Sequence, residues 1–267
     1  MKKIIFLLCV ASMLVVACDK DDPVPTPDDP TNPTDTTQVD PPTDGLILNA
    51  VTDIDGNVYD AVRIGNQVWM AQNLRTTRFA NGDAIPEGQT ATYTEPYRYA
   101  PNGNESNVTE YGYLYNWAAV MHGEASSITN PSGVQGVCPE GWHVPSDAEW
   151  TQLTDYVSSQ SEYVCSGNGE NIAKALAADH GWQTTTDNEC AVGYDQNSNN
   201  SIGFSALPAG YSAGSFFNFF DLYAYFWSAT EHEDNSAYAS ALGYRYARVG
   251  RGDEDECTGL SVRCVRD

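Results

Sequence analysis

Hydrophobic and polar residues divide the chain into three stretches of different character. Residues 4–17 are an uninterrupted run of apolar or small side chains that follows two lysines. The run is shorter than the ~20 residues that a membrane-spanning helix needs, so it predicts a signal peptide over residues 1–17. Residues 18–44 have almost no aliphatic side chains, whereas residues 45–267 mix apolar and polar positions as a folded domain does.

The second stretch, residues 18–44, is predicted to be a disordered tether. Seven of the 14 prolines of the chain lie in it, interleaved with Asp and Thr. Such a composition buries little apolar area and favours extended, polyproline-like conformations. No second linker divides residues 45–267, so we expect one folded domain there.

The folded stretch is predicted to open with a β-hairpin and to contain two helices. Runs of β-forming residues span 58–64 and 67–70, and the Gly-Asn pair between them is typical of a two-residue turn. Ser146 and Glu149 have the spacing of a capping box, and apolar residues follow at helical steps. A second helix is predicted over residues 170–178. Short aromatic strands and Gly-rich turns follow, so the predicted class is α+β.

The charge balance of the chain is strongly acidic. There are 36 Asp and Glu against 13 Lys and Arg, a formal net charge of −23. Binding to a nucleic-acid backbone needs clustered Lys and Arg, so the composition argues against a nucleic-acid partner. It argues equally against attraction to an anionic membrane surface.

The end of the apolar run resembles a bacterial lipobox. Residues 15–18 read Val-Val-Ala-Cys, which implies that cleavage leaves Cys18 as a lipid-modified first residue, with palmitate or a similar acyl chain as the membrane anchor. The alternative is an ordinary signal peptide followed by a stray cysteine. Residues 19–22, Asp-Lys-Asp-Asp, resemble the lipoprotein export signal of Bacteroidetes, which implies the outer face of the outer membrane. The alternative there is simply the start of the acidic tether.

Seven blocks of sequence run in order through the folded stretch. They are residues 53–59, 64–74, 112–117, 138–150, 203–210, 226–230 and 261–266. Together they resemble the Fibrobacter succinogenes major paralogous domain of bacterial surface and secreted proteins. The same blocks are remotely similar to the formylglycine-generating-enzyme and C-type-lectin folds. The resemblance implies an α+β, C-type-lectin-like domain with few helices, short antiparallel strands and long loops.

The resemblance also bears on the cysteines. Disulfides are expected in an exported protein, because it meets an oxidising compartment. Cys138 and Cys264 resemble the long bridge of lectin-like folds, while Cys165 and Cys190 bracket the second predicted helix and are suited to a local bridge. Cys257 is then unpaired. In the alternative, Cys257 and Cys264 form the copper-binding pair of the formylglycine-generating family, although their spacing here is wider than in that family.

No catalytic constellation emerges from the motifs. The four histidines have no zinc-ligand spacing, and neither a nucleophile elbow nor a phosphate-binding loop is present. We therefore expect no enzyme activity, metal or cofactor. His143 at the helix entrance is interpreted as structural, and the acidic run 253–256 as a solvated turn rather than a cation site. Asp53, Asp55 and Asn57 alternate as calcium ligands do, but the rest of such a loop is missing, which favours a tight turn.

The best candidate for a binding surface is an aromatic-rich segment. Eight of the twelve residues 216–227 are aromatic. Neighbouring residues on a strand point to opposite faces, so a single core on one face of the strand cannot bury every ring. Part of the segment is expected in the core, above all residues 226–227. The predicted ligand contacts are Tyr211, Phe217, Tyr223 and Tyr225, because aromatic faces stack on sugars or anchor a protein partner.

The sequence therefore predicts a surface-exposed lipoprotein that binds a glycan or another extracellular ligand without catalysis. The alternatives are an oxidoreductase related to the formylglycine-generating family and a structural component of a cell-surface assembly.

Overall fold

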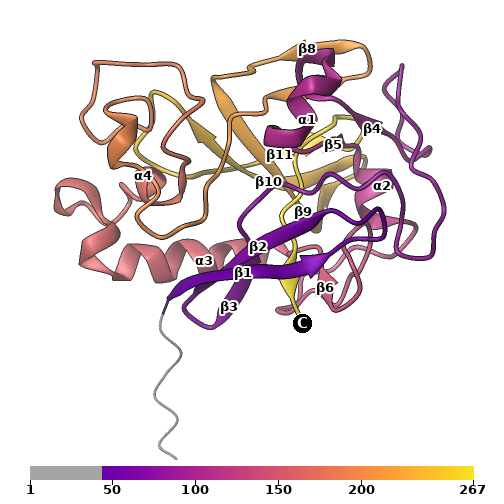
Figure 1. Ribbon diagram of the computed structural model, residues 1–267, viewed down its shortest axis with the longest axis horizontal. Helices are drawn as coiled ribbons and strands as arrows, with labels where there is room; N and C mark the ends of the chain where they lie inside the picture. Colours follow the sequence, from indigo (N-terminus) through magenta and orange to yellow (C-terminus); the bar gives the residue numbers. More distant parts are fainter. Residues whose placement is uncertain (1–43) are drawn as a thin grey trace, which may run out of the picture. The chain divides into compact units, whose positions relative to one another are not determined.

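Two antiparallel sheets carry the fold of residues 44–267, the part of the chain that the computed structural model describes (Figure 1). The first sheet consists, in spatial order, of β1 (Gly45–Thr52), β2 (Val58–Ile64), β3 (Gln67–Met70), β12 (Val265–Arg266) and β6 (Trp142–His143). The second consists of β11 (Gly250–Asp255), β10 (Ser236–Gly243) and β9 (Tyr223–Glu233). Two small ribbons pair β4 (Arg98–Tyr99) with β5 (Leu114–Tyr115) and β7 (Tyr211–Ala213) with β8 (Phe216–Asn218).

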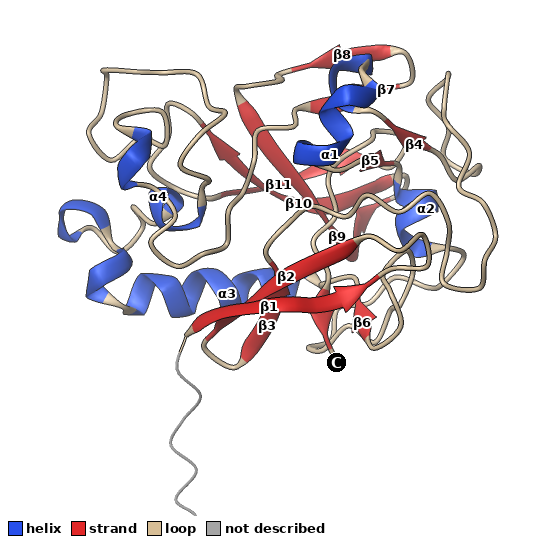
Figure 2. Cartoon of the chain, in the orientation of Figure 1, coloured by secondary structure: helices blue, strands red, loops and turns tan. Residues whose placement is uncertain are grey.

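The helices of the described residues are few, and long loops connect the elements (Figure 2). They are α1 (Val108–Tyr111), α2 (Trp117–Met121), α3 (Asp147–Ser159) and α4 (Ala173–Leu176). This mixture of small antiparallel sheets and few helices confirms the predicted α+β class. No helix within residues 44–267 is both long enough and apolar enough to cross a bilayer.

The predicted hairpin and first helix are both present. β2 pairs with β3 through a turn in which Gly65 has a φ of +57°, a conformation that glycine adopts without steric cost. At the start of α3, the Ser146 hydroxyl accepts the Glu149 backbone N–H, and the Glu149 carboxylate accepts the Ser146 N–H at 2.9 Å. The apolar face of α3 is buried against β2, β9 and β10.

The second predicted helix is much shorter than expected. The prediction covered residues 170–178, but α4 spans only Ala173–Leu176. Ala177 is extended, with φ −76° and ψ 146°, and forms a parallel bridge with Ala206. The surrounding apolar residues are buried as the pattern indicated. Pairing with a distant segment therefore outweighs the helix propensity of an alanine-rich stretch.

β9 lies between two hydrophobic clusters. Phe226 packs with Trp150 of α3 in one cluster, while its neighbour Trp227 points into the other. Two indole N–H groups bind carbonyls of β9 where its pairing with β10 is irregular. Trp117 donates to the Ser228 carbonyl at 3.0 Å, and Trp150 donates to the Trp227 carbonyl at 3.3 Å. Because buried carbonyls need partners, these bonds allow β9 to leave its regular pairing inside the core.

A fully buried arginine, Arg263, connects segments that are far apart in sequence. Its guanidinium donates to Asn73 Oδ1 at 2.7 Å and to the carbonyls of Met70, Phe204 and Ser205 at 3.0, 2.5 and 2.8 Å. Burial lowers the pKa of Arg263 to about 9, which leaves the side chain charged at neutral pH. Its charge is solvated by dipoles of the protein rather than by a carboxylate.

The last strand, β12, lies inside the first sheet. Val265 faces Trp69 of β3 on one side and His143 of β6 on the other. The sheet thus joins both ends of the described residues, which all fall within one compact unit. The predicted signal peptide, residues 1–17, the predicted lipidation site Cys18 and the tether up to residue 43 lie outside the described part of the chain.

Candidate functional site

Three of the four predicted ligand contacts lie together where β9 begins. Tyr223 and Tyr225 share one face of the strand, with ring centroids 5.5 Å apart and planes only 16° from parallel. Tyr211 of β7 packs edge-on against Tyr225, with centroids 6.1 Å apart. All three side chains are half-buried. The structure therefore brings these rings to one surface.

The fourth predicted contact, Phe217, is not part of that surface. It pairs with Ser212 in the β7–β8 ribbon, so its side chain leaves the ribbon on the face opposite to Tyr211. There it packs against a separate cluster that contains Tyr99 and Leu114. The pleat of the ribbon, rather than closeness in sequence, decides which rings meet.

Two further aromatic residues pack against Tyr223. Phe219 lies 5.1 Å from Tyr223, and Tyr246, after β10, lies 6.2 Å from Tyr223. Tyr246 is 55% exposed. Tyr211, Tyr223, Tyr225 and Tyr246 are called the tyrosine patch below. Tyr246 was not among the predicted contacts. The register of the β9–β10 hairpin brings it close to Tyr223, because Gly243, three residues before Tyr246, faces Tyr223.

Small residues of β10 let the rings of the tyrosine patch lie close against the sheet. Tyr225 faces Ala241 and Tyr223 faces Gly243, and cross-strand partners share a face of the sheet. A Cβ atom at Gly243 would stand 2.7 Å from Tyr223 Cε1 and 2.8 Å from Tyr246 Cδ2. Only glycine therefore allows both rings to approach β10 so closely.

A hollow of about 690 Å³ lies beside the tyrosine patch. Tyr223 and Tyr246 form part of its wall, and the small residues of β10 lie at its base. The remainder of the wall comes from residues 168–188 and 245–250. The volume is within the range of small-ligand sites, about 300–1,000 Å³.

The turn that supports the patch contains a residue in an uncommon backbone conformation. Phe219 has a φ of +60°, although it is not glycine. Its carbonyl accepts the N–H groups of Leu222 and Tyr223, both at 3.0 Å, and its ring packs on Tyr211. Such conformations cost about 1–3 kcal/mol and persist where the surroundings fix them, often at functional sites. The turn thus fixes the position of Tyr223.

Acidic groups lie near the far end of the patch. Burial, with the nearby charge of Glu254, raises the pKa of Tyr225 well above its ordinary value. Burial and the flanking Asp253 and Asp255 raise the pKa of Glu254 as well. These three acids lie in β11, so the expectation of a solvated turn over residues 253–256 is wrong for most of the run. Cross-strand pairing with β10 holds them extended.

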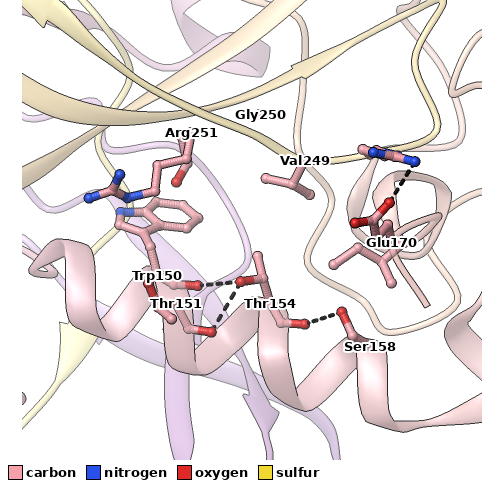
Figure 3. Close-up of a pocket in the computed structure, with 11 residues that line it drawn as sticks. Trp150, Thr151, Thr154, Ser158, Glu170, Val249, Gly250 and Arg251 are labelled. Atoms are coloured by element: carbon pink, nitrogen blue, oxygen red, sulfur yellow. Dashed lines mark hydrogen bonds and ion pairs between the residues drawn. The ribbon is translucent and has the colours of Figure 1, made fainter.

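A second hollow, of about 300 Å³, lies between α3 and β11 (Figure 3). Its hydroxyl groups are already used within the helix: Thr154 donates to the Trp150 carbonyl at 3.1 Å, and Ser158 donates to the Thr154 carbonyl. Arg251 at its rim binds both carboxylate oxygens of Asp147, at 2.5 and 2.7 Å. Arg248 and Glu170 also line this hollow and pair with each other, so it presents both signs of charge to a ligand.

Both predicted disulfides are present. Cys138 is bonded to Cys264 and Cys165 to Cys190, while Cys257 is free. Since Cys264 is bonded to Cys138, the alternative pair Cys257–Cys264 is not formed. The shorter bridge closes the loop whose residues line the larger hollow.

His143 and Asp53 lie in structural positions. His143 Nε2 lies 2.7 Å from Glu149 Oε1, and Nδ1 lies 2.7 Å from Asp267 Oδ1. Burial lowers the pKa of His143, but the two carboxylates raise it by more, so the net change is upward. Asp53 Oδ1 accepts the backbone N–H groups two and four residues further on, which forms the predicted tight turn.

No group of three or more His, Cys, Asp or Glu side chains within residues 44–267 is placed to hold a metal.

Comparison with models of protein families gives a match that covers most of the described residues. A family model described as the Fibrobacter succinogenes major domain matches residues 62–266, a range that includes the tyrosine patch and both disulfides. No curated protein and no solved structure matches the chain.

Proposed function

The chain belongs to the Fibrobacter succinogenes major domain family, and from this premise we propose that residues 45–267 bind a glycan on the tyrosine patch without catalysing a reaction. The observation that carries the proposal is the near-parallel pair Tyr223 and Tyr225 beside the exposed ring of Tyr246, over a base of small residues. Open aromatic faces suit the apolar C–H faces of sugar rings. A wall of aromatic rings with a few polar groups is also the usual composition of a small-ligand site.

We also propose that the fold is C-type-lectin-like. Three features support this: the small number of helices, the position of β12 within the first sheet, and the long Cys138–Cys264 bridge that ends next to β12. The lectin comparison concerns the scaffold alone, because the calcium-binding tripeptides of lectins, Glu-Pro-Asn or Gln-Pro-Asp, are absent from the sequence, where residues 95–97 read Glu-Pro-Tyr. Sugar binding on the tyrosine patch is accordingly proposed to need no calcium.

The proposed location is the outer membrane, with the domain anchored at the cell surface through acylated Cys18. The supporting features are the lipobox-like residues 15–18 and the charge pattern that follows them.

Feeding cells a clickable palmitate analogue should label the wild-type chain, and Cys18→Ala should remove the label. Equal labelling of both chains would contradict the anchor. Protease shaving of whole cells should remove the wild-type domain; full protection would contradict surface exposure.

Replacing Tyr223 or Tyr246 by alanine is expected to weaken glycan binding by about 1–2 kcal/mol or more, roughly 5–30-fold. The loss follows from removing a ring that stacks on the sugar. Because Tyr246 is 55% exposed, Tyr246→Ala should leave the melting temperature almost unchanged. The ligand is first identified on a glycan array with the full-length chain in detergent, and affinities are then measured by isothermal titration calorimetry.

Tyr194 provides the matched control, since it is also exposed, at 38%, but does not belong to the tyrosine patch. Tyr194→Ala should bind as the wild type does. Absence of any glycan ligand, or binding that survives both patch substitutions, would contradict the proposed function.

A further inference from the structure

The larger hollow has a charge that is unusual for this chain. The chain carries a net charge of −23, yet the hollow is lined by two arginines, Arg245 and Arg248, and by no Asp or Glu. Four other hollows on the described residues each include an Asp or a Glu in their lining. The hollow beside the tyrosine patch is thus locally suited to an anion.

Both arginines keep free donors. Arg245 Nε lies 3.5 Å from Asp187 Oδ2, and one Arg248 Nη lies 2.5 Å from Glu170 Oε2, so each guanidinium meets a carboxylate through one nitrogen. All four side chains are about 60% exposed, and such exposed pairs are weak. The Arg245 guanidinium also lies over the ring of Tyr244, at 5.1 Å, which restricts its orientation. An incoming anion can therefore bind the remaining N–H groups without breaking a strong interaction.

Asparagine amides supply neutral donors in the same hollow. Asn168, Asn171 and Asn188 line it, and all three lie within or beside the loop closed by the Cys165–Cys190 disulfide. The side-chain oxygens of Asn168 and Asn188 accept backbone N–H groups of that loop, which fixes both amides. Within residues 44–267, the NH₂ groups of these two side chains make no hydrogen bond and are free to bind sugar hydroxyls.

We infer that the hollow binds an acidic sugar unit, so that the glycan of the proposed function is one that carries carboxylate or sulfate groups. This inference rests on the proposed function: the sugar ring stacks on Tyr223 or Tyr246, its acidic group meets Arg245 and Arg248, and its hydroxyls meet the asparagine amides. The planar guanidinium fork matches two oxygens of either acid group. The remaining negative charge of the chain acts weakly at this distance, because charges are screened beyond about 8 Å at physiological ionic strength.

The test uses the full-length chain in detergent and oligosaccharides in matched pairs. One arm compares oligogalacturonates with their methyl esters, and the other compares sulfated galactan oligosaccharides with their desulfated forms. We expect the acidic member of at least one pair to bind about tenfold more tightly than its neutral partner, as one charge-assisted hydrogen bond would give. The arm that shows the preference distinguishes carboxylate from sulfate.

Arg245→Gln should reduce this preference several-fold, because only Arg248 is then left to meet the acidic group, and it should leave the melting temperature unchanged, because the side chain is exposed. Arg251→Gln removes the same charge from β11 but lies in the smaller hollow, so it should keep the preference (Figure 3). Equal binding of acidic and neutral members, or loss of the preference in Arg251→Gln but not in Arg245→Gln, would overturn the inference. If neutral glycans bind in a Tyr223-dependent manner without an acidic preference, only this inference fails. If no oligosaccharide binds at all, the proposed function fails with it.

Discussion

Replacing Arg263 by methionine is expected to lower the free energy of unfolding by at least about 3 kcal/mol. The guanidinium is fully buried and donates to four acceptors, namely Asn73 Oδ1 and three backbone carbonyls. Methionine fills a similar volume but donates nothing, so these acceptors are left in the core without partners. Each unpaired buried polar group costs about 1–3 kcal/mol, which outweighs the relief from no longer burying a charge. Urea unfolding of the isolated protein measures the difference.

Two companion variants identify the cause of this loss. Arg263→Lys keeps the charge but lacks the planar fork, so it should lose stability while remaining above the methionine variant. Arg266→Met removes an exposed arginine three residues further on and should change the free energy of unfolding by no more than about 0.5 kcal/mol. A methionine variant at position 263 as stable as the wild type would show that the carbonyls find other partners.

Removing the Cys138–Cys264 disulfide is expected to cost about 4–5 kcal/mol. The bond joins residues 126 positions apart, and the entropy that a cross-link removes from the unfolded chain grows with the length of the closed loop. Cys165 and Cys190 are only 25 positions apart, so the same argument gives about 3–4 kcal/mol for the shorter bridge.

Double alanine variants of each pair, unfolded in urea under identical conditions, check both values and their order. The comparison is internally controlled, because each variant removes two cysteines and one bond. A larger loss from the 165–190 variant than from the 138–264 variant would contradict the loop-entropy explanation. It would indicate instead that the local loop contributes mainly through contacts in the folded state.

Local signals predicted local structure well. The Gly-Asn turn of the first hairpin and the capping box at Ser146 are fixed by neighbouring residues, and both appear as predicted. The helix predicted over residues 170–178 was too long, because Ala177 pairs with Ala206. That contact joins distant parts of the chain, so no local sequence pattern predicts it. The acidic run 253–256 was expected in a turn for the same reason: its extended conformation is imposed by pairing with β10.

The candidate site shows the same limit. The aromatic density drew attention to Tyr211, Tyr223 and Tyr225, and these rings meet. Phe217 lies nearby in sequence but on the other face of its ribbon, while Tyr246 joins the patch from beyond β10. The arginines and asparagines of the hollow come from two separate loops, so only the folded arrangement reveals that two arginines and no acidic residue line it.

The position of β12 determines when the first sheet can be completed during synthesis of the chain. Its residues are synthesised after those of β1, β2, β3 and β6, yet β12 lies between β3 and β6. Arg263 and Cys264, which complete the core and the long bridge, are made just before it. While these residues are still on the ribosome, the first sheet has a missing strand and cannot close. The growing chain therefore cannot complete its first sheet, its buried Arg263 network or its long disulfide until residue 266 has been made.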